Sequence, residues 1–420
     1  MLTPLQQPTQ PTESKPRAKR KSLRALQFNV WLDATKVRDG ITQTADIILD
    51  SQADIVSLIE VKNFLGEDFV ERLKRRIHER SEGRVQYYGS FAGNPMKLSF
   101  DADAAIISKH PIVDQTIVFR TRENCIVRSL VQIDDQTTMA VYSVHLEYRY
   151  YTCYLPRGYS SNSDLFPGWS KLGTGYFSWI WEHLPSWLCS PTKCLDVVGD
   201  APLLQPVADP KLIHQDNTAS QRPAVIQRLI DDAQSLRRES QHNKTKPPII
   251  LVMGDFNEPS TLDWTESTKH LTNHSGLVYE WDTTERLRQS GFVDTYREMY
   301  PNPATHPGFT WPAAARGSHE SKPRPTDWIK QADERDRIDF IFYYDDDENN
   351  QRKAHEPPKT RQQPKQLKVQ DSWIVGTPVT VVQGQLVDES KLFEDKCRYP
   401  AGHLWPSDHR AVMTVFELLS

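Results

Sequence analysis

The amino-acid sequence predicts an α/β domain, and three observations lead to that prediction. Apolar strand segments alternate with amphipathic helical segments, beginning with strand 23–30, helix 39–51 and strand 54–59. Hydrophobic residues make up 38% of the chain, which is enough for a sizeable core. Acidic, amide or histidine side chains stand where several strands end. A strand–helix–strand order brings such ends to one edge of a sheet, where a functional site can form.

The helices are predicted from apolar side chains three and four residues apart, as with Ile41, Ala45 and Ile48 in the first of them. Two more helices are predicted, at 64–80 and 222–239. Further strands are predicted at residues 85–91, 104–108, 126–133, 138–145 and 249–253.

Three segments depart from this alternation. Residues 1–22 are rich in Pro, Gln and Thr and then in Lys and Arg, which predicts a disordered basic tail. Residues 148–221 are an aromatic-rich insertion, either a packed lobe or a lid or interfacial surface beside the site. Residues 345–370 are charged and rich in Pro and Gln, which predicts a disordered loop between two strands. The rest of 23–420 is predicted to form one large domain.

Composition narrows the classes of function. The formal net charge is −4, so the chain has no global basic field for a polyanion, and nucleic-acid binding is not favoured. No apolar stretch is long enough to span a membrane, and the basic start lacks the apolar core of a secretory signal. The five scattered cysteines indicate free thiols. We expect an intracellular, cytoplasmic protein, with nuclear targeting by the basic tail left open.

The polar strand ends are suited to metal-assisted phosphoester chemistry. Asn29 and Glu60 follow the first two strands, and His145 and Asp255 close two later ones. Hydrolysis of this kind needs oxygen ligands for a hard cation, a base for water and donors that face the phosphate. These side chains can supply all three.

Six short motifs, taken in order, resemble the endonuclease/exonuclease/phosphatase (DNase I-like) superfamily. The resemblance implies a four-layered α/β sandwich, in which two packed mixed β-sheets are flanked by helices, with a divalent-metal phosphoesterase site at one rim. The motifs are Phe28-Asn29-Val30-Trp31, Ser57-Leu58-Ile59-Glu60-Val61, Ser143-Val144-His145-Leu146, Gly254-Asp255-Phe256-Asn257, Arg337-Ile338-Asp339-Phe340 and Ser407-Asp408-His409.

The metal ligands expected from chemistry and from this resemblance are Glu60, Asn29 and Asp408. Glu60 is the best candidate for direct ligation of Mg²⁺ or Mn²⁺, because such a site uses one or two carboxylates and keeps water for the rest. Asn29 and Asp408 would complete or orient the ligand set.

The expected catalytic residues are His409, Asp339, Asp255, Asn257 and His145. His409 and Asp339 resemble an acid–histidine dyad, in which the carboxylate fixes the imidazole tautomer and raises its basicity. Asp255 competes with His409 for the role of base, and Asn257 would hold Asp255 or the phosphate. A structural ion pair with Arg337 or another cation is the alternative for Asp339. His145 would donate to a phosphate oxygen or to the leaving group.

Trp311 and Arg149 are the expected substrate-binding residues, the first as an aromatic over the pocket and the second at its mouth. The predicted function is metal-dependent hydrolysis of a phosphodiester or phosphomonoester by in-line attack of an activated water. A nuclease acting on DNA or RNA is the alternative, and a catalytically inactive binding module is the alternative of another class. The substrate class stays open, and so does membrane-surface contact through the aromatic insertion.

Overall fold

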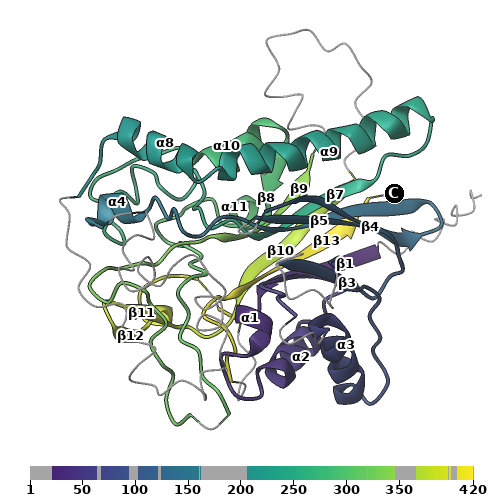
Figure 1. The fold of residues 1–420 in the computed structure, drawn as a ribbon, viewed down its shortest axis with the longest axis horizontal. Coiled ribbons are helices and arrows are strands. Elements are labelled where there is room, and N and C mark those ends of the chain that lie inside the picture. Colours follow the sequence, from purple (N-terminus) through teal and green to yellow (C-terminus); the bar gives the residue numbers. More distant parts are fainter. Residues whose placement is uncertain are drawn as a thin grey trace, which may run out of the picture.

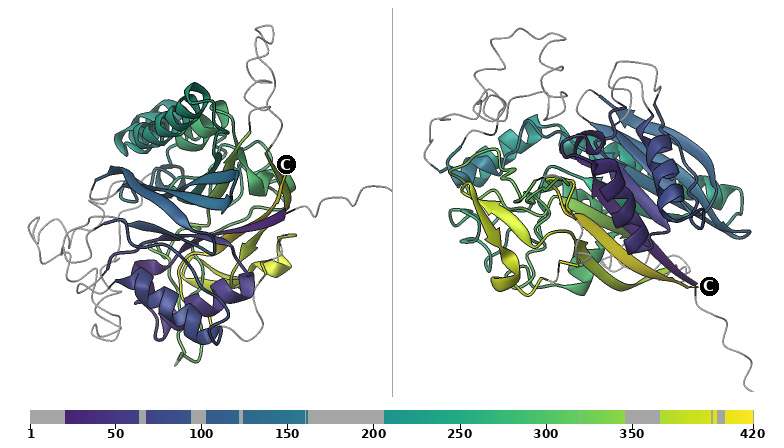
Figure 2. Two further views of the ribbon diagram at one scale, coloured as in Figure 1. Left: turned by 90° about the vertical axis from the view of Figure 1, so that its right-hand side faces the viewer. Right: turned by 90° about the horizontal axis from the view of Figure 1, so that it is seen from below.

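Two mixed β-sheets pack face to face, with helices on their outer sides (Figure 1). The two further views in Figure 2 show the same layers from other sides. The computed structural model describes residues 21–63, 68–93, 103–121, 124–159, 161, 206–318, 320–345, 366–395, 397–398 and 404–419. The predicted four-layered α/β sandwich is confirmed.

The first sheet has five strands in the order β10-β13-β1-β2-β3. Its central strands β1 and β2 are parallel, and the other pairs are antiparallel. The strands are β1 (Lys21–Asn29), β2 (Ile55–Ile59), β3 (Ala104–Ser108), β10 (Leu367–Val375) and β13 (Ala411–Leu418).

The second sheet has six strands in the order β4-β5-β6-β7-β9-β8, with β6 and β7 parallel. A separate two-stranded ribbon is formed by β11 (Val379–Val382) and β12 (Gln385–Asp388). The strands of the sheet are β4 (Ile112–Arg120), β5 (Cys125–Asp134), β6 (Thr137–His145), β7 (Ile249–Asp255), β8 (Phe292–Asp294) and β9 (Asp339–Tyr344).

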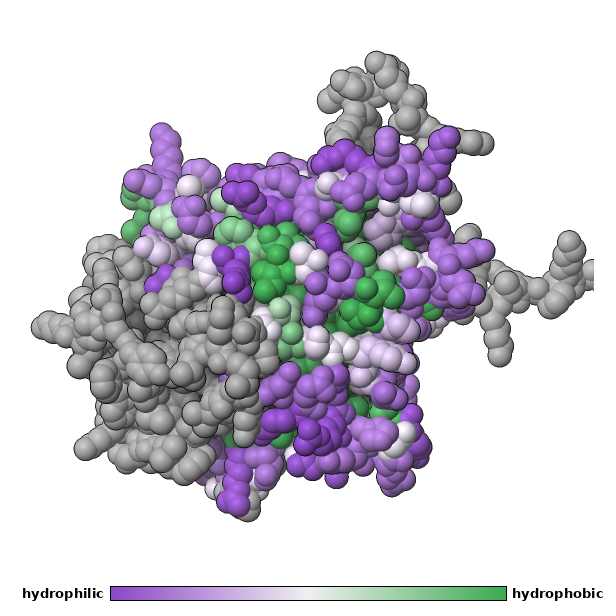
Figure 3. All heavy atoms as spheres, turned by 45° about the vertical axis from the view of Figure 1, so that its right-hand side comes forward, coloured by the Kyte–Doolittle hydropathy of each residue, from purple (hydrophilic) through white to green (hydrophobic). Residues whose placement is uncertain are grey.

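Helices cover both outer faces because each has one apolar side. The helices α2 (Gly40–Ser51) and α3 (Phe69–Arg80) lie on the first sheet, and α8 (Pro210–Ala219), α9 (Arg222–His242) and α10 (Asp282–Gln289) lie over the second (Figure 1). Figure 3 shows the consequence: one face is hydrophilic above and below, with apolar side chains gathered in a band between. The short helical turns are α1 (Trp31–Ala34), α4 (Tyr154–Arg157), α11 (Thr295–Met299) and η3 (Glu389–Lys391).

The core between the sheets is apolar, with few polar links. Leu23, Ala25 and Ile55 of the first sheet join one buried cluster with Val141 and Leu251 of the second. Burying a Leu or Ile side chain of this size contributes about 1.5–3 kcal/mol, so these layers hold the strand ends in fixed positions.

Several predicted boundaries were wrong. Strand β1 begins at Lys21, inside the predicted tail, because Lys21 pairs with Leu418 of β13. Strand β10 begins at Leu367, inside the predicted loop, because Leu367 also pairs with Leu418. Residues 85–91 form only isolated bridges, and strand β4 was missed because Asp114, Gln115 and Thr116 interrupt its apolar pattern.

The described ends of the aromatic insertion are packed. Tyr151, Tyr154 and Tyr159 are buried in one cluster, which favours a packed lobe for this part. Residues 162–205, most of the tail and residues 346–365 lie outside the described residues, so the predictions for them stay predictions. Among the helices that the structure describes, none combines the length and apolar character that crossing a membrane requires.

Candidate active site

Three strand ends of the second sheet place their side chains in one row. His145 of β6 pairs with Asp255 of β7, and Asp255 pairs with Asp339 of β9. Gly254 permits this alignment, since a Cβ at its position would lie 2.0 Å from Val144 O. The row therefore follows from strand register and a close approach of β6 and β7.

The first sheet adds Asn29 and Glu60 at the same rim. The Nδ2 of Asn29 donates to Glu60 Oε1 at 3.1 Å and to Asp255 Oδ2 at 3.0 Å, so it links the two sheets. The backbone N–H of Leu32 donates to Glu60 Oε2 at 2.9 Å. This contact depends on a left-handed turn, with φ of 52° at Trp31 and 56° at Leu32. Such a conformation costs about 1–2 kcal/mol per non-glycine residue, so packing and these hydrogen bonds must offset it.

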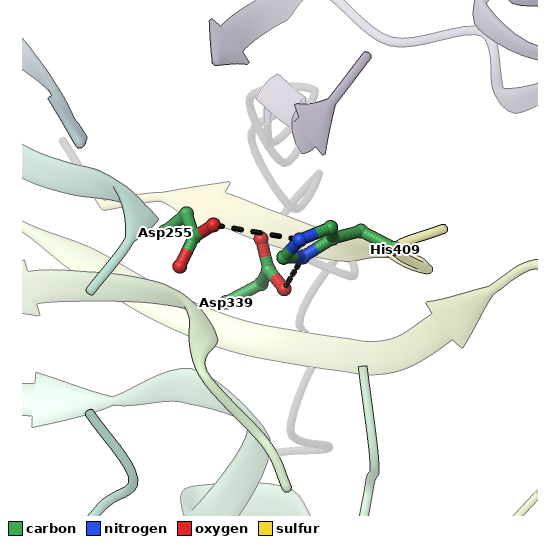
Figure 4. A group of neighbouring side chains, drawn as sticks. All are labelled: Asp255, Asp339 and His409. Carbon is green, nitrogen blue, oxygen red and sulfur yellow. Dashed lines mark hydrogen bonds and ion pairs between the residues drawn. The ribbon is translucent and has the colours of Figure 1, made fainter. Parts of the chain in front are cut away.

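His409 and Asp339 form a buried acid–histidine pair (Figure 4). Nδ1 of His409 lies 2.9 Å from Asp339 Oδ2, and the other carboxylate oxygen accepts from Gln27 Nε2 at 2.9 Å. Burial lowers the pKa of His409, but the charges of Asp339 and Asp255 outweigh it and raise the pKa well above its usual value. Arg337, the alternative ion-pair partner for Asp339, instead contacts Asp263 and Asp294.

Asp255 lies between two imidazoles. Its Oδ2 is 3.6 Å from His409 Nε2 and 3.9 Å from His145 Nε2. Burial and the neighbouring charge of Asp339 raise the pKa of Asp255 to about 6. A carboxylate with such a pKa is a stronger base than an ordinary aspartate and is still largely ionised at neutral pH.

A second acid–histidine pair was not predicted. Nδ1 of His145 and Nζ of Lys62 both lie 2.6 Å from Asp103 Oδ2. Burial would raise the pKa of Asp103, but the charges of Lys62 and His145 lower it to about 2. The same carboxylate outweighs the effect of burial on His145 and raises its pKa. Asp103 directly precedes β3, so a search of strand starts as well as strand ends would have found it.

Asp408 supplies the observation that fits a cation. Its Oδ1 is buried without a hydrogen-bond partner among the described residues. Burial, together with the charges of Glu60 and Asp255, raises the pKa of Asp408 to about 7. Excess buried negative charge and an unpartnered oxygen suit a hard cation with oxygen ligands. Asn29 links Glu60 to Asp255, so the expected ligand set and the catalytic row adjoin.

Asp255, Asp339 and His409 are also close enough to hold a metal ion together. Asp339 Oδ2 and His409 Nδ1 already bond each other, and Gln27 occupies Asp339 Oδ1. These atoms of the group are therefore already engaged in hydrogen bonds within the protein.

The remaining predicted residues make structural contacts of their own. Trp311 is 5% exposed, and its ring centroid lies 6.5 Å from that of His409, so it packs beside the row of strand-end side chains. Arg149 forms a two-point pair with Glu147, which already balances its charge. Asn257 Nδ2 donates to Leu146 O, and its N–H donates to Asp255 Oδ1, so it shapes the loop that carries Asp255.

The chain matches the model of a known protein family and is similar to another protein over most of its length. The sequence model of the Endonuclease/Exonuclease/phosphatase family matches residues 26–409. An uncharacterised protein of Caenorhabditis elegans, F14F9.5, is 25% identical over 330 residues, which is 76% of this chain and 78% of that protein.

Solved structures with low sequence identity also align with most of this chain. The human nocturnin catalytic domain with bound sulfate is 14% identical, with a TM-score of 0.44, over 97% of this chain and all 100% of that one. D. rerio TDP2 complexed with single strand DNA product is 11% identical, with a TM-score of 0.40, over 94% of this chain and 99% of that one.

Proposed function

Because this chain belongs to the endonuclease/exonuclease/phosphatase family, we propose that it is a divalent-metal-dependent hydrolase of phosphoesters. The observation that carries the proposal is the meeting of Asp255, Asp339 and His409 with Asn29 and Glu60 at one rim of the two sheets. The reaction is in-line attack of an activated water on a phosphodiester or phosphomonoester.

Asp255 accepts the proton of the attacking water. Its raised pKa suits a base that works near neutral pH, and it lies within 3.6 Å of His409 Nε2. His409 is held protonated by Asp339, so its imidazolium stabilises the negative charge that builds up on the phosphate oxygens.

His145 donates a proton to the leaving oxygen. Asp103 fixes its Nδ1, so Nε2 points toward the row, 3.9 Å from Asp255. Lys62 forms an ion pair with Asp103 in turn, which fixes the position of this carboxylate. Glu60 and Asp408 would hold a cation such as Mg²⁺ or Mn²⁺, which would supply Lewis-acid polarisation of the phosphoryl oxygen.

The test is metal-dependent hydrolysis by the purified protein. The panel contains abasic and single-stranded DNA, RNA, sphingomyelin, inositol phosphates, and simple phosphate mono- and diesters. We expect turnover of at least one class in Mg²⁺ or Mn²⁺, its loss in EDTA, and its loss in His409→Ala. His214→Ala is the matched control, because His214 forms an exposed pair with Asp282 at 3.1 Å. No turnover by a folded, metal-supplied protein would refute the proposal.

The role of His145 has its own test. If it protonates the leaving oxygen, His145→Ala should slow esters with poor leaving groups far more than 4-nitrophenyl esters, which leave without a proton. Equal losses on both kinds of ester would assign His145 to phosphate binding instead.

A further inference from the structure

Arg324 lies beside the proposed cation site, one backbone segment away from Asp408. Residues 313–316 run between them: Ala313 N donates to Asp408 O at 2.6 Å, and Arg324 N donates to Ala315 O at 3.0 Å. The guanidinium is within electrostatic reach of the Asp408 carboxylate. Arg324 was not among the residues that the sequence motifs pointed to.

The guanidinium of Arg324 has few partners for a charge in this position. Its Nη2 donates to Lys36 O, and its Nη1 faces Glu320 Oε1 across 3.8 Å. Its Nε is buried and bonds to nothing within the described part of the chain. The side chain is only 28% exposed, and burial lowers the pKa of Arg324 below its usual value.

Three fully buried arginines are paired more closely than the partly buried Arg324. Arg157, Arg222 and Arg337 each have a carboxylate oxygen within 3.2 Å. A buried cation normally has such a partner, because desolvation of an unpaired charge is costly. Arg324 has only the Glu320 carboxylate at 3.8 Å, so its charge is less closely paired than theirs.

Trp31 holds this guanidinium next to the site. The Arg324 guanidinium carbon lies 5.3 Å from the centroid of the Trp31 ring, a cation–π contact. The backbone N–H of Trp31 donates to Asn29 Oδ1 at 3.0 Å, so the turn that carries this ring is fixed to one of the expected metal-site residues. The left-handed turn that carries Trp31 thus serves both the metal site and Arg324.

We propose that Arg324, supported by the Trp31 ring, binds a second phosphate of the substrate next to the scissile phosphoester. The inference rests on the proposed function. A guanidinium presents paired N–H donors that match phosphate oxygens, and the unpartnered Nε–H is one of them. The substrate class is a phosphoester with two neighbouring phosphates. The second phosphate is either a diester in a nucleotide chain or a terminal monoester.

Turnover of three thymidine substrates tests this subsite. The dinucleotide has one phosphate, the 5′-phosphorylated dinucleotide adds a terminal monoester, and the trinucleotide adds a flanking diester. Arg324→Gln should lower kcat/KM on a two-phosphate substrate by at least about tenfold more than on the plain dinucleotide, mainly through KM. Which of the two longer substrates is affected identifies the source of the second phosphate. Equal losses on all three would overturn the proposal.

A matched control and a second variant distinguish a loss of phosphate binding from a loss of the fold. Arg84→Gln removes an arginine with a similarly distant carboxylate, Glu82 at 3.7 Å, and should change none of the three rates. If Arg324→Gln does not fold, Trp31→Leu removes only the support of the guanidinium and must give the same substrate-dependent loss, smaller in size. A Trp31→Leu loss independent of the second phosphate would also overturn the proposal.

Binding without turnover separates the subsite from the hydrolase activity. By calorimetry, the wild type should bind thymidine 3′,5′-bisphosphate more tightly than thymidine 3′-phosphate by about tenfold, and Arg324→Gln should remove that difference. If the wild type shows this binding preference but hydrolyses no phosphoester, the proposed function is refuted and the proposed subsite still stands. A preference that survives in Arg324→Gln would overturn the subsite.

Discussion

Replacing Asp339 by asparagine should lower kcat by about 10³–10⁴-fold while leaving the fold intact. The carboxylate lies 2.9 Å from His409 Nδ1. With an effective dielectric constant of about 20, a charge pair at this distance is worth about 6 kcal/mol, or about four factors of ten. Asp255, 3.6 Å from the other imidazole nitrogen, retains part of that stabilisation, so the loss should fall somewhat below the full value.

The assay is Mg²⁺-dependent hydrolysis of bis(4-nitrophenyl) phosphate, or of the best substrate of the panel, with thermal unfolding measured in parallel. The amide in the Asp339→Asn variant would keep one oxygen for His409 or for Gln27 but not for both, so we expect a modest loss of stability and a large loss of activity. Asp282→Asn, at the exposed His214 pair, is the control. A kcat within about tenfold of the wild type would refute the proposed role of the pair.

Three further predictions concern buried charge. Burial raises the pKa of Glu334 to about 8, so between about pH 5 and 8 the folded state binds more protons and stability should fall as pH rises, by about 1.4 kcal/mol per pH unit at most. Urea unfolding of Glu334→Gln should show a flatter pH dependence; an unchanged slope would contradict the assignment. Asp408→Asn should raise the thermal midpoint in EDTA at pH 8 by roughly 2–5 °C and shrink the increase caused by Mg²⁺, because it removes a buried charge beside Glu60. An undiminished Mg²⁺ effect would exclude Asp408 from the cation site. Arg337→Ala should cost about 3–5 kcal/mol in urea unfolding, because the buried Asp294 would lose its cation while Asp263 keeps only Arg297, and a loss below about 1 kcal/mol would count against that network.

The fold class and the row of polar side chains at the strand ends were predictable because both depend on local pattern. Alternating apolar segments specify strands and helices, and a strand fixes where its last side chain emerges. Asp255 and Asp339 needed only the correct register of β7 and β9 to become neighbours. Strand β4 escaped prediction because Asp114, Gln115 and Thr116 interrupt its apolar pattern, although it pairs with the next strand, β5. The starts of β1 and β10 escaped prediction because their pairing with β13 comes from a distant part of the chain.

The contacts that the predicted substrate-binding residues make within the protein could not be derived from sequence. The sequence motifs favoured Trp311 as an aromatic side chain over the substrate pocket, but its neighbours Tyr151 and Trp328 fill the space around it. Arg149 stands near His145 in sequence, but Glu147, two residues away, engages its guanidinium. Both outcomes depend on packing, which a linear pattern does not encode.

The sequence by itself determined the α/β architecture and the identity of the polar groups at the strand ends, because hydrophobic periodicity and short motifs are properties of neighbouring residues. Only the tertiary structure decided which other side chains hydrogen-bond to these polar groups and hold them in place. Asp103 reaches His145 across 42 positions, Gln27 reaches Asp339 across 312, and Arg324 reaches the segment after Trp31 across 288. Such contacts arise from the packing of the two sheets and their loops, since chain-distant side chains meet only when the layers bring them within hydrogen-bonding distance.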